Sequence, residues 1–248
     1  MGYIRGMLPP RRHEISRVEA FSDAVFGFAL ALLVVSSQPP TTYAELMDRM
    51  IGAVPFACCF ALLVWIWYEH YAFFRRYGLN DGYTILLNIV LLFVVLLYVY
   101  PLKFMFDSAF ARVLPRLAPP EGMQFYQLAN ASIVYAVGFI AIFVLFALLY
   151  RHAYAERAAL GLSELETFDV KAHMGHHLVS VGVGVLSLLI AAVGPLDLAP
   201  LSPMTYSLMG PAHWIAGVRN ARRRTVLEEQ LAGGTDPVSP APGALAPE

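Results

Sequence analysis

The sequence predicts an all-α integral membrane protein with six transmembrane helices per subunit. Of its 248 residues, 58% are hydrophobic and 14% are charged, whereas soluble domains average about 25% charged residues. The mean hydropathy is +0.59, and the charged residues gather in short clusters between long uncharged stretches. The net charge of −1 carries no information about nucleic acid, and because the sequence has no basic domain we predict no nucleic-acid partner.

Six apolar runs are long enough to predict spans, since a helix needs about 20 mostly apolar residues to cross the hydrocarbon core. The predicted spans cover residues 18–37, 51–74, 82–105, 127–150, 175–194 and 202–218. The sixth is the weakest because it is short and contains Pro203, Pro211 and His213, so an interfacial position is its alternative. Glu166 and Asp169 are expected in the loop before the fifth span.

The first span carries costly polar residues at its start, namely Arg17, Ser22 and Asp23 in the segment RVEAFSDAVFGFALALLVV. An ionisable residue within a spanning helix usually marks a functional site. This segment is therefore the predicted carrier of function, and it indicates ion movement across a membrane.

An apolar stripe runs along the first span when it is drawn at 100° per residue. Its members are Arg17, Phe21, Phe28, Leu32 and Val35, with Ala31 beside them. Ser22 and Asp23 point away from the stripe, towards neighbouring helices. If several subunits turn this stripe to a shared axis, stacked apolar rings form a constriction that gates by dewetting. The alternative is contact with lipid or ordinary packing in a bundle.

Three polar residues are expected at one depth in the membrane. Asp23, His70 and Asn88 lie at matching distances from the same ends of the first three spans, which corresponds to a depth of about 9 Å. A network among them, with Ser22 as a further donor, would remove the cost of unpaired polar groups in hydrocarbon. The alternative is that water satisfies each group separately.

The remaining spans carry weaker signals. Aromatic residues near the ends of the second and third spans are typical of interfacial belts. Cys58 and Cys59 are adjacent in an apolar run, which predicts small buried side chains and no disulfide framework. Gly182 and Gly184 in the fifth span predict close helix packing.

The basic residues predict the orientation and the domain organisation. With the N-terminus in the cytoplasm, thirteen of the 17 Lys and Arg residues fall on the inside and four outside, as the positive-inside rule requires for an even number of spans. We expect a cytoplasmic segment over residues 1–16, the membrane domain over 17–220 and a disordered cytoplasmic tail over 221–248. The protein is thus predicted as a multi-pass cell-membrane protein with both termini inside.

A histidine cluster is the basis of the alternative functions. His173, His176 and His177 share one helical face, as metal ligands require, but no partner for a complete metal site is visible in the later spans. We predict an interfacial cluster without a metal or cofactor. An integral-membrane enzyme that uses this cluster and a secondary transporter are the alternatives to a channel.

The motif RxxxFSD, formed by Arg17, Phe21, Ser22 and Asp23, resembles the hallmark of the transmembrane protein 175 family of potassium channels, found in endolysosomes and in bacteria. The segment WYEHYAFFRR is similar to the second helix of that family. The segment LLNIVLLFVVLLYVYP, with Asn88 and a helix-ending Pro101, is similar to the third.

This resemblance implies a passive channel for potassium or other monovalent cations and no enzymatic activity. One motif per chain implies a homotetramer in which the first helix of each subunit lines the pore. Phe28 would form the narrowest ring, followed by Leu32 and Val35. The sequence departs from the family at Phe28, where Ile or Leu is usual, and at Ala31, where Thr is usual.

Overall fold

The computed structural model describes residues 15–35, 40–111 and 124–233. All regular structure within these ranges is helical. The elements are α1 (Arg17–Val35), α2 (Tyr43–Ile51), α3 (Ala53–Tyr77), α4 (Gly82–Ala111), α5 (Phe125–Ala155), α6 (Glu164–Val193), η2 (Leu196–Leu198), α7 (Leu201–Met204), η3 (Thr205–Leu208) and α8 (Met209–Gly233).

The chain is an all-helical membrane protein with six long helices. Five of them, α1, α3, α4, α5 and α6, are long and apolar enough to cross a membrane. The predicted sixth span corresponds to α7, η3 and the first part of α8. Because the second half of α8 carries a cluster of arginines, α8 is less apolar than the other five helices.

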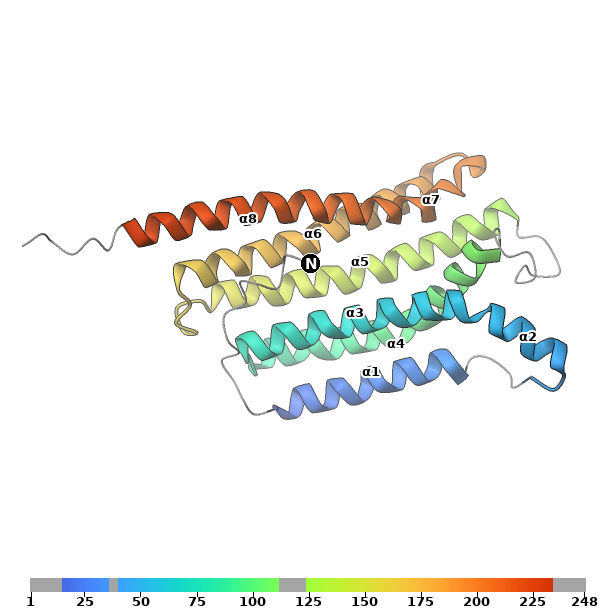
Figure 1. Cartoon of the computed structure of the whole chain (residues 1–248), viewed down its shortest axis with the longest axis horizontal. Helices are drawn as coiled ribbons and strands as arrows, with labels where there is room; N and C mark the ends of the chain where they lie inside the picture. Colours follow the sequence, from blue (N-terminus) through green and yellow to red (C-terminus); the bar gives the residue numbers. More distant parts are fainter. Residues whose placement is uncertain (1–14, 36–39, 112–123, 234–248) are drawn as a thin grey trace, which may run out of the picture.

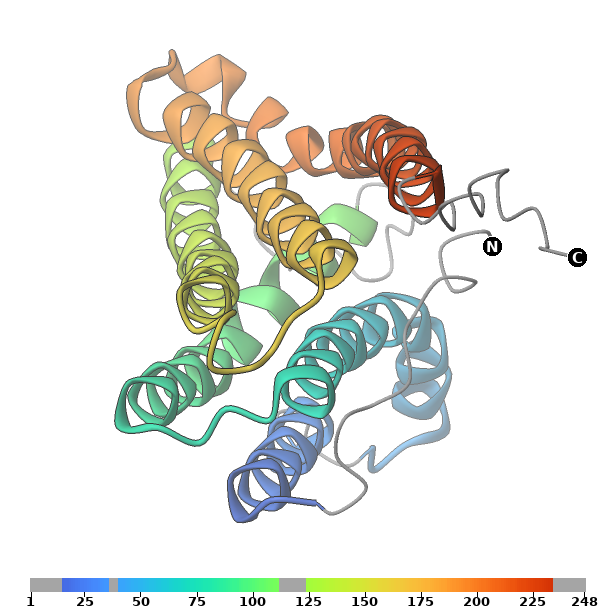
Figure 2. The same cartoon turned by 90° about the vertical axis from the view of Figure 1, so that its left-hand side faces the viewer.

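The long helices run in alternating directions along the long axis of the molecule (Figure 1). The end view in Figure 2 places α1 at one edge of the bundle, where it packs against α3 and α4. The helix α5 contacts α4 and α6, and α8 lies along α6. The molecule therefore consists of an α1, α3 and α4 group and an α5, α6 and α8 group, and the largest contact between the two groups is that of α4 with α5.

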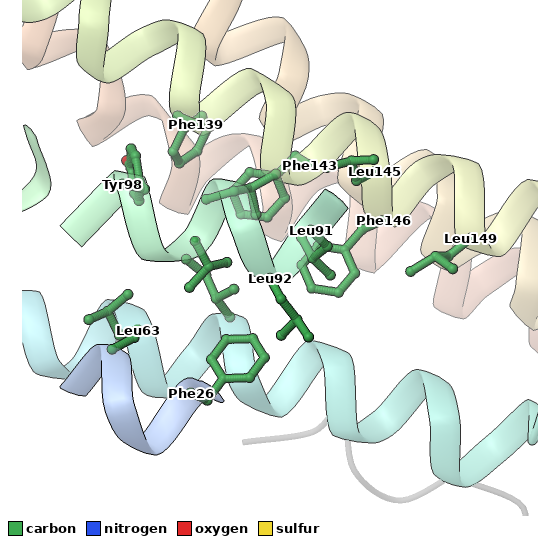
Figure 3. Close-up of a cluster of buried hydrophobic side chains, with 14 of the residues drawn as sticks. Phe26, Leu63, Leu91, Leu92, Tyr98, Phe139, Phe143, Leu145, Phe146 and Leu149 are labelled. Carbon is green, nitrogen blue, oxygen red and sulfur yellow. The ribbon is translucent and has the colours of Figure 1, made fainter. Parts of the chain in front are cut away.

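A continuous hydrophobic core fills the space between these helices (Figure 3). It includes Phe26 of α1, Leu63 of α3, Leu91 of α4 and Phe143 of α5, all buried. Removing such side chains from lipid is no gain in itself, so close contact and dispersion hold the helices together.

The helix α6 begins eleven residues before the predicted fifth span. Ser163 and Glu166 form a capping box, in which the Ser163 amide donates to Glu166 Oε2 at 2.9 Å and the Glu166 amide donates to Ser163 Oγ at 3.2 Å. The expectation that Glu166 and Asp169 lie in a loop was wrong, since both are buried in α6. Asp169 is accommodated there because its carboxylate binds Arg76 and Arg224, each at 3.1 Å.

Two further features of the helices differ from the prediction. The helix α2 was not predicted because nine residues are too few for a span. Pro101 does not end its helix, since α4 continues to Ala111 and a proline costs the helix one backbone hydrogen bond without always stopping it.

The tail expected to be disordered from residue 221 is helical as far as Gly233. Arg224 explains this extension, because it pairs with Asp169 on α6 and with Glu228 one turn further along α8. Residues 234–248 lie outside the described part, as does most of the predicted segment 1–16.

Candidate functional site

A capping box fixes the start of α1. The Ser16 amide donates to Glu19 Oε2 at 2.8 Å, and the Glu19 amide donates to Ser16 Oγ at 3.2 Å. This reciprocal pair satisfies two of the free amides at a helix start. It places Arg17 at the first helical position and the RxxxFSD motif in the first two turns of α1.

A buried hydrogen-bond chain links α1, α4 and α3. Ser22 Oγ donates to the Val18 carbonyl at 2.7 Å and accepts a hydrogen bond from Asn88 Nδ2 at 3.0 Å. Asn88 Oδ1 lies 2.8 Å from His70 Nε2, which donates to it. All three side chains are at most 2% exposed. The structure therefore brings Ser22, His70 and Asn88 together across three helices.

Asp23 lies on a different side of α1. Its Oδ1 accepts a hydrogen bond from the indole Nε1 of Trp67 at 2.8 Å, and its side chain is exposed. The expected direct link from Asp23 to His70 and Asn88 is replaced by two separate contacts, one through Ser22 and one through Asp23. Trp67 was missed as a partner, although it stands three residues before His70 and so on the same side of α3.

The opposite face of α1 is bare. Phe21, Phe28 and Val35 are 60%, 57% and 75% exposed, and Ala31 is also exposed. Leu32 lies at the edge of this face and is half-buried against the core. Arg17 is exposed at one end of the same face.

The predicted histidine cluster lies far from α1, inside the α5, α6 and α8 group. His173 stacks on Tyr150 with ring centroids 5.3 Å apart and planes at 4°, and its Nδ1 lies 2.8 Å from the Asp169 carbonyl. His177 stacks on Phe146 at 5.1 Å. These rings pack as aromatic side chains between α5 and α6.

Two partners of this cluster come from distant helices and were not predicted. His176 contacts His213 of α8, with ring centroids 3.8 Å apart. Glu69 of α3 approaches His177, with Oε2 at 3.7 Å from Nε2, and accepts a hydrogen bond from Trp65 at 3.2 Å. Among the described residues no group of three or more His, Cys, Asp or Glu side chains is arranged to hold a metal ion.

Comparisons with known proteins show which proteins this chain is similar to. The family model of the endosomal/lysosomal potassium channel TMEM175 matches residues 17–98, which include the motif, His70 and Asn88. A protein of Marivirga tractuosa described as a potassium channel is 38% identical over 230 residues, covering 88% of this chain and 93% of that protein. A potassium channel of Chamaesiphon minutus is 27% identical over 152 residues, covering 58% of this chain and 68% of that protein.

Solved structures resemble the fold. A crystal structure of a variant of the potassium channel MtTMEM175 superposes with a TM-score of 0.75 at 37% identity, covering 88% of this chain and 98% of that one. A TMEM175 homologue from Chamaesiphon minutus shares the fold with a TM-score of 0.53 at 22% identity, over 84% of this chain and 96% of that one. The motif, the helix arrangement and these similarities agree: the chain belongs to the TMEM175 family of potassium channels, which are not enzymes.

Proposed function

We propose that this chain forms a homotetrameric channel in the cell membrane that passes potassium and other monovalent cations. In this proposal α1 of each subunit lines a central pore, and Phe28, Ala31, Leu32 and Val35 form its constriction. The names of the two relatives, both potassium channels, support the ion.

The observation that carries the proposal is the contrast between the two faces of α1. One face is fixed to α3 and α4 through Ser22, which is fully buried, and through Phe26. On the other face Phe28 and Val35 are exposed, and α1 lies at one edge of the bundle (Figure 2). A pore-lining helix needs this arrangement, because it must hold to its own subunit on one side and meet the pore on the other.

The polar contacts of α1 would fix its rotation. Ser22 lies on the buried face and contacts Asn88 at 3.0 Å, whereas Asp23 lies beside that face and contacts Trp67 at 2.8 Å. Rotating α1 would break both hydrogen bonds, and a buried polar group left unpaired costs about 1–3 kcal/mol. The RxxxFSD motif is therefore proposed to hold the Phe28 face towards the pore.

The chemistry of the constriction bears on selectivity. Rings of apolar side chains gate a pore by excluding water. Neither Phe28 nor Ala31 offers a side-chain oxygen to replace the hydration shell of an ion. We therefore expect conduction of potassium with limited rejection of sodium.

The orientation follows from the basic residues at one end of the bundle. The start of α1, the end of α3, the α5–α6 connection and the end of α8 all lie at this end (Figure 1). Together with the last turns of α5 and the middle of α8, these segments carry Arg17, Arg75, Arg76, Arg151, Arg157, Arg219, Arg222, Arg223 and Arg224. Under the positive-inside rule this end faces the cytoplasm, together with both termini.

The proposal is tested by ion flux through purified protein in liposomes with opposed potassium and sodium gradients. We expect a reversal potential shifted from zero towards the equilibrium potential of potassium. For Phe28→Ala we expect the flux to rise by about tenfold or more, because the constriction widens. Phe93→Ala is the matched control, since Phe93 is a phenylalanine of similar exposure, 61%, that belongs to α4 and not to α1. No current from an intact tetramer, or equal increases for the two variants, would contradict the proposal.

Asp23→Ala tests the tetramer separately. Loss of the contact to Trp67 frees the rotation of α1, so a shift from tetramer towards smaller species is expected on size-exclusion chromatography with light scattering. A normal tetramer with normal flux would remove Asp23 from the proposed mechanism.

A further inference from the structure

The middle of α8 carries a basic face that the ion pathway does not use. Ile215, Arg219, Arg222, Arg223 and Val226 follow the spacing i, i+4, i+7, i+8 and i+11, which places them on one side of the helix. All five are exposed. Within the described ranges none of the three arginines has a hydrogen bond, an ion pair or a ring contact.

Arg224 fixes the direction of this face. It points the opposite way, where its Nε lies 3.1 Å from Asp169 Oδ1 of α6 and its Nη1 binds Glu228. Asp169 also binds Arg76 in the last turn of α3 at 3.1 Å. This ion-pair cluster, formed by Arg76, Asp169, Arg224 and Glu228, ties α8 to α6 and α3. The basic face therefore cannot turn inward without breaking the cluster.

The same cluster indicates the depth of the basic face in the membrane. Arg76 stands one residue before the end of α3, and Asp169 stands in the second turn of α6, so both mark the ends of apolar spans. Arg219 lies five residues before Arg224, which corresponds to about 7.5 Å along the helix axis. Trp214, 71% exposed, precedes it by more than one turn, and exposed Trp residues are typical of the membrane–water interface. Arg219, Arg222 and Arg223 are thus at the level of lipid headgroups.

We propose that this face binds the phosphate groups of anionic phospholipids in the adjacent leaflet. Ile215 before the three arginines and Val226 after them supply apolar contacts for the lipid chains. Arginine side chains can extend to the headgroups from within the membrane interface. Glu229 is the exposed acidic residue on this part of α8, so positive charge remains in excess. This site does not depend on ion conduction, since it requires only that the chain is embedded in a membrane.

The test is lipid binding to the purified full-length protein in detergent, measured by native mass spectrometry with phosphatidylglycerol and phosphatidylcholine of equal chain length. Each arginine near an anionic surface contributes about fivefold in affinity. We expect R222Q/R223Q to weaken phosphatidylglycerol binding about 25-fold and to leave phosphatidylcholine binding unchanged. The control R151Q/R157Q removes two exposed arginines at the same end of the bundle and should leave phosphatidylglycerol binding unchanged.

Two further measurements distinguish lipid binding through charge from other causes of a changed signal. R222K/R223K retains the charge and should retain most of the binding, which separates lost charge from lost packing. Millimolar inorganic phosphate should not displace the lipid, because it lacks the chains that contact Ile215 and Val226. Equal binding by R222Q/R223Q and the unmodified protein, equal losses in both double variants, or full displacement by inorganic phosphate would each overturn the proposal. Potassium flux through the same variants, reconstituted in liposomes, reports on the channel independently.

Discussion

The two groups of helices differ in the contacts of their buried histidines. The family model covers α1, α3 and the first half of α4, which contain His70, whereas His177 belongs to the α5, α6 and α8 group. His70 hydrogen-bonds to Asn88 at 2.8 Å, and Asn88 in turn donates a hydrogen bond to Ser22. His177 instead packs its ring on Phe146. His70 also packs its ring on Phe74, with centroids 4.5 Å apart, so both histidines are packed as aromatic rings and the difference is the hydrogen bond to Asn88. A buried histidine in this protein therefore forms a polar link between helices only where a neighbouring helix supplies a hydrogen-bonding side chain.

Replacing each histidine by phenylalanine tests this difference, and it has the largest expected effect. His70→Phe leaves Asn88 Oδ1 buried without its donor, so the free energy of unfolding should fall by about 2 kcal/mol. His177→Phe keeps the aromatic contacts to Phe146 and Tyr150 and should cost less than about 1 kcal/mol. Unfolding of the purified proteins by a denaturing detergent measures both. Equal losses would refute the distinction.

A second pair of variants tests packing in the α5–α6 contact. A Cβ at Gly184 would lie 2.8 Å from Ile140 Cγ1 and 3.1 Å from Phe139 Cδ1, whereas one at Gly182 would meet no atom within 4 Å. Gly184→Ala should therefore lower the free energy of unfolding by about 1–2 kcal/mol. Gly182→Ala should leave it unchanged or raise it by up to about 1 kcal/mol. The opposite order in the same unfolding assay would show that α5 and α6 do not pack this closely.

The smallest expected effect is at Asp81, which joins the two groups at their shared end. Asp81 caps α4 through the amides of Tyr83 and Thr84, and its Oδ2 lies 3.1 Å from His152 of α5. Partial burial raises the pKa of Asp81, but hydrogen bonds from Thr84 and His152 outweigh it and lower the pKa from 3.8 to about 2.

Because the pKa of Asp81 is lower in the folded state, its stabilising contribution is complete above the ordinary value and is lost as the pH falls through about 2. Asp81→Ala should lower the free energy of unfolding by about 1 kcal/mol at neutral pH. Thermal unfolding at a series of pH values should show this difference shrinking below the ordinary pKa of Asp81. A difference that stays constant down to the acid end of the series would contradict the assignment.

Much of the architecture is predictable because long apolar runs have few alternatives. The five apolar spans and the depth shared by His70 and Asn88 follow from spacing alone. The start of α6 was missed because the segment from Glu164 to Met174 is too polar for a hydropathy window, although the Ser163 and Glu166 capping box was present in the sequence. Helix ends in this chain are thus set by local capping and ion pairs more than by apolarity.

The site was less predictable because its contacts depend on how the helices rotate. Ser22 and Asp23 are adjacent in sequence, and spacing alone cannot decide which of them meets Asn88. In the structure Ser22 hydrogen-bonds with Asn88, and Asp23 hydrogen-bonds with Trp67. The approach of Glu69 to His177 joins α3 to α6, and no periodicity within either helix indicates such a long-range contact.

The most direct test of the proposed pore is the accessibility of α1 to a positively charged thiol reagent during potassium flux. Ala31→Cys and Ala29→Cys would be compared in a Cys58→Ser/Cys59→Ser background. Ala31 lies on the bare face of α1, whereas Ala29, 0% exposed, faces the interior of its own subunit. If α1 lines the pore, the reagent blocks flux through Ala31→Cys and leaves Ala29→Cys conducting. Unchanged flux through a labelled Ala31→Cys protein would contradict the assignment of α1 to the pore.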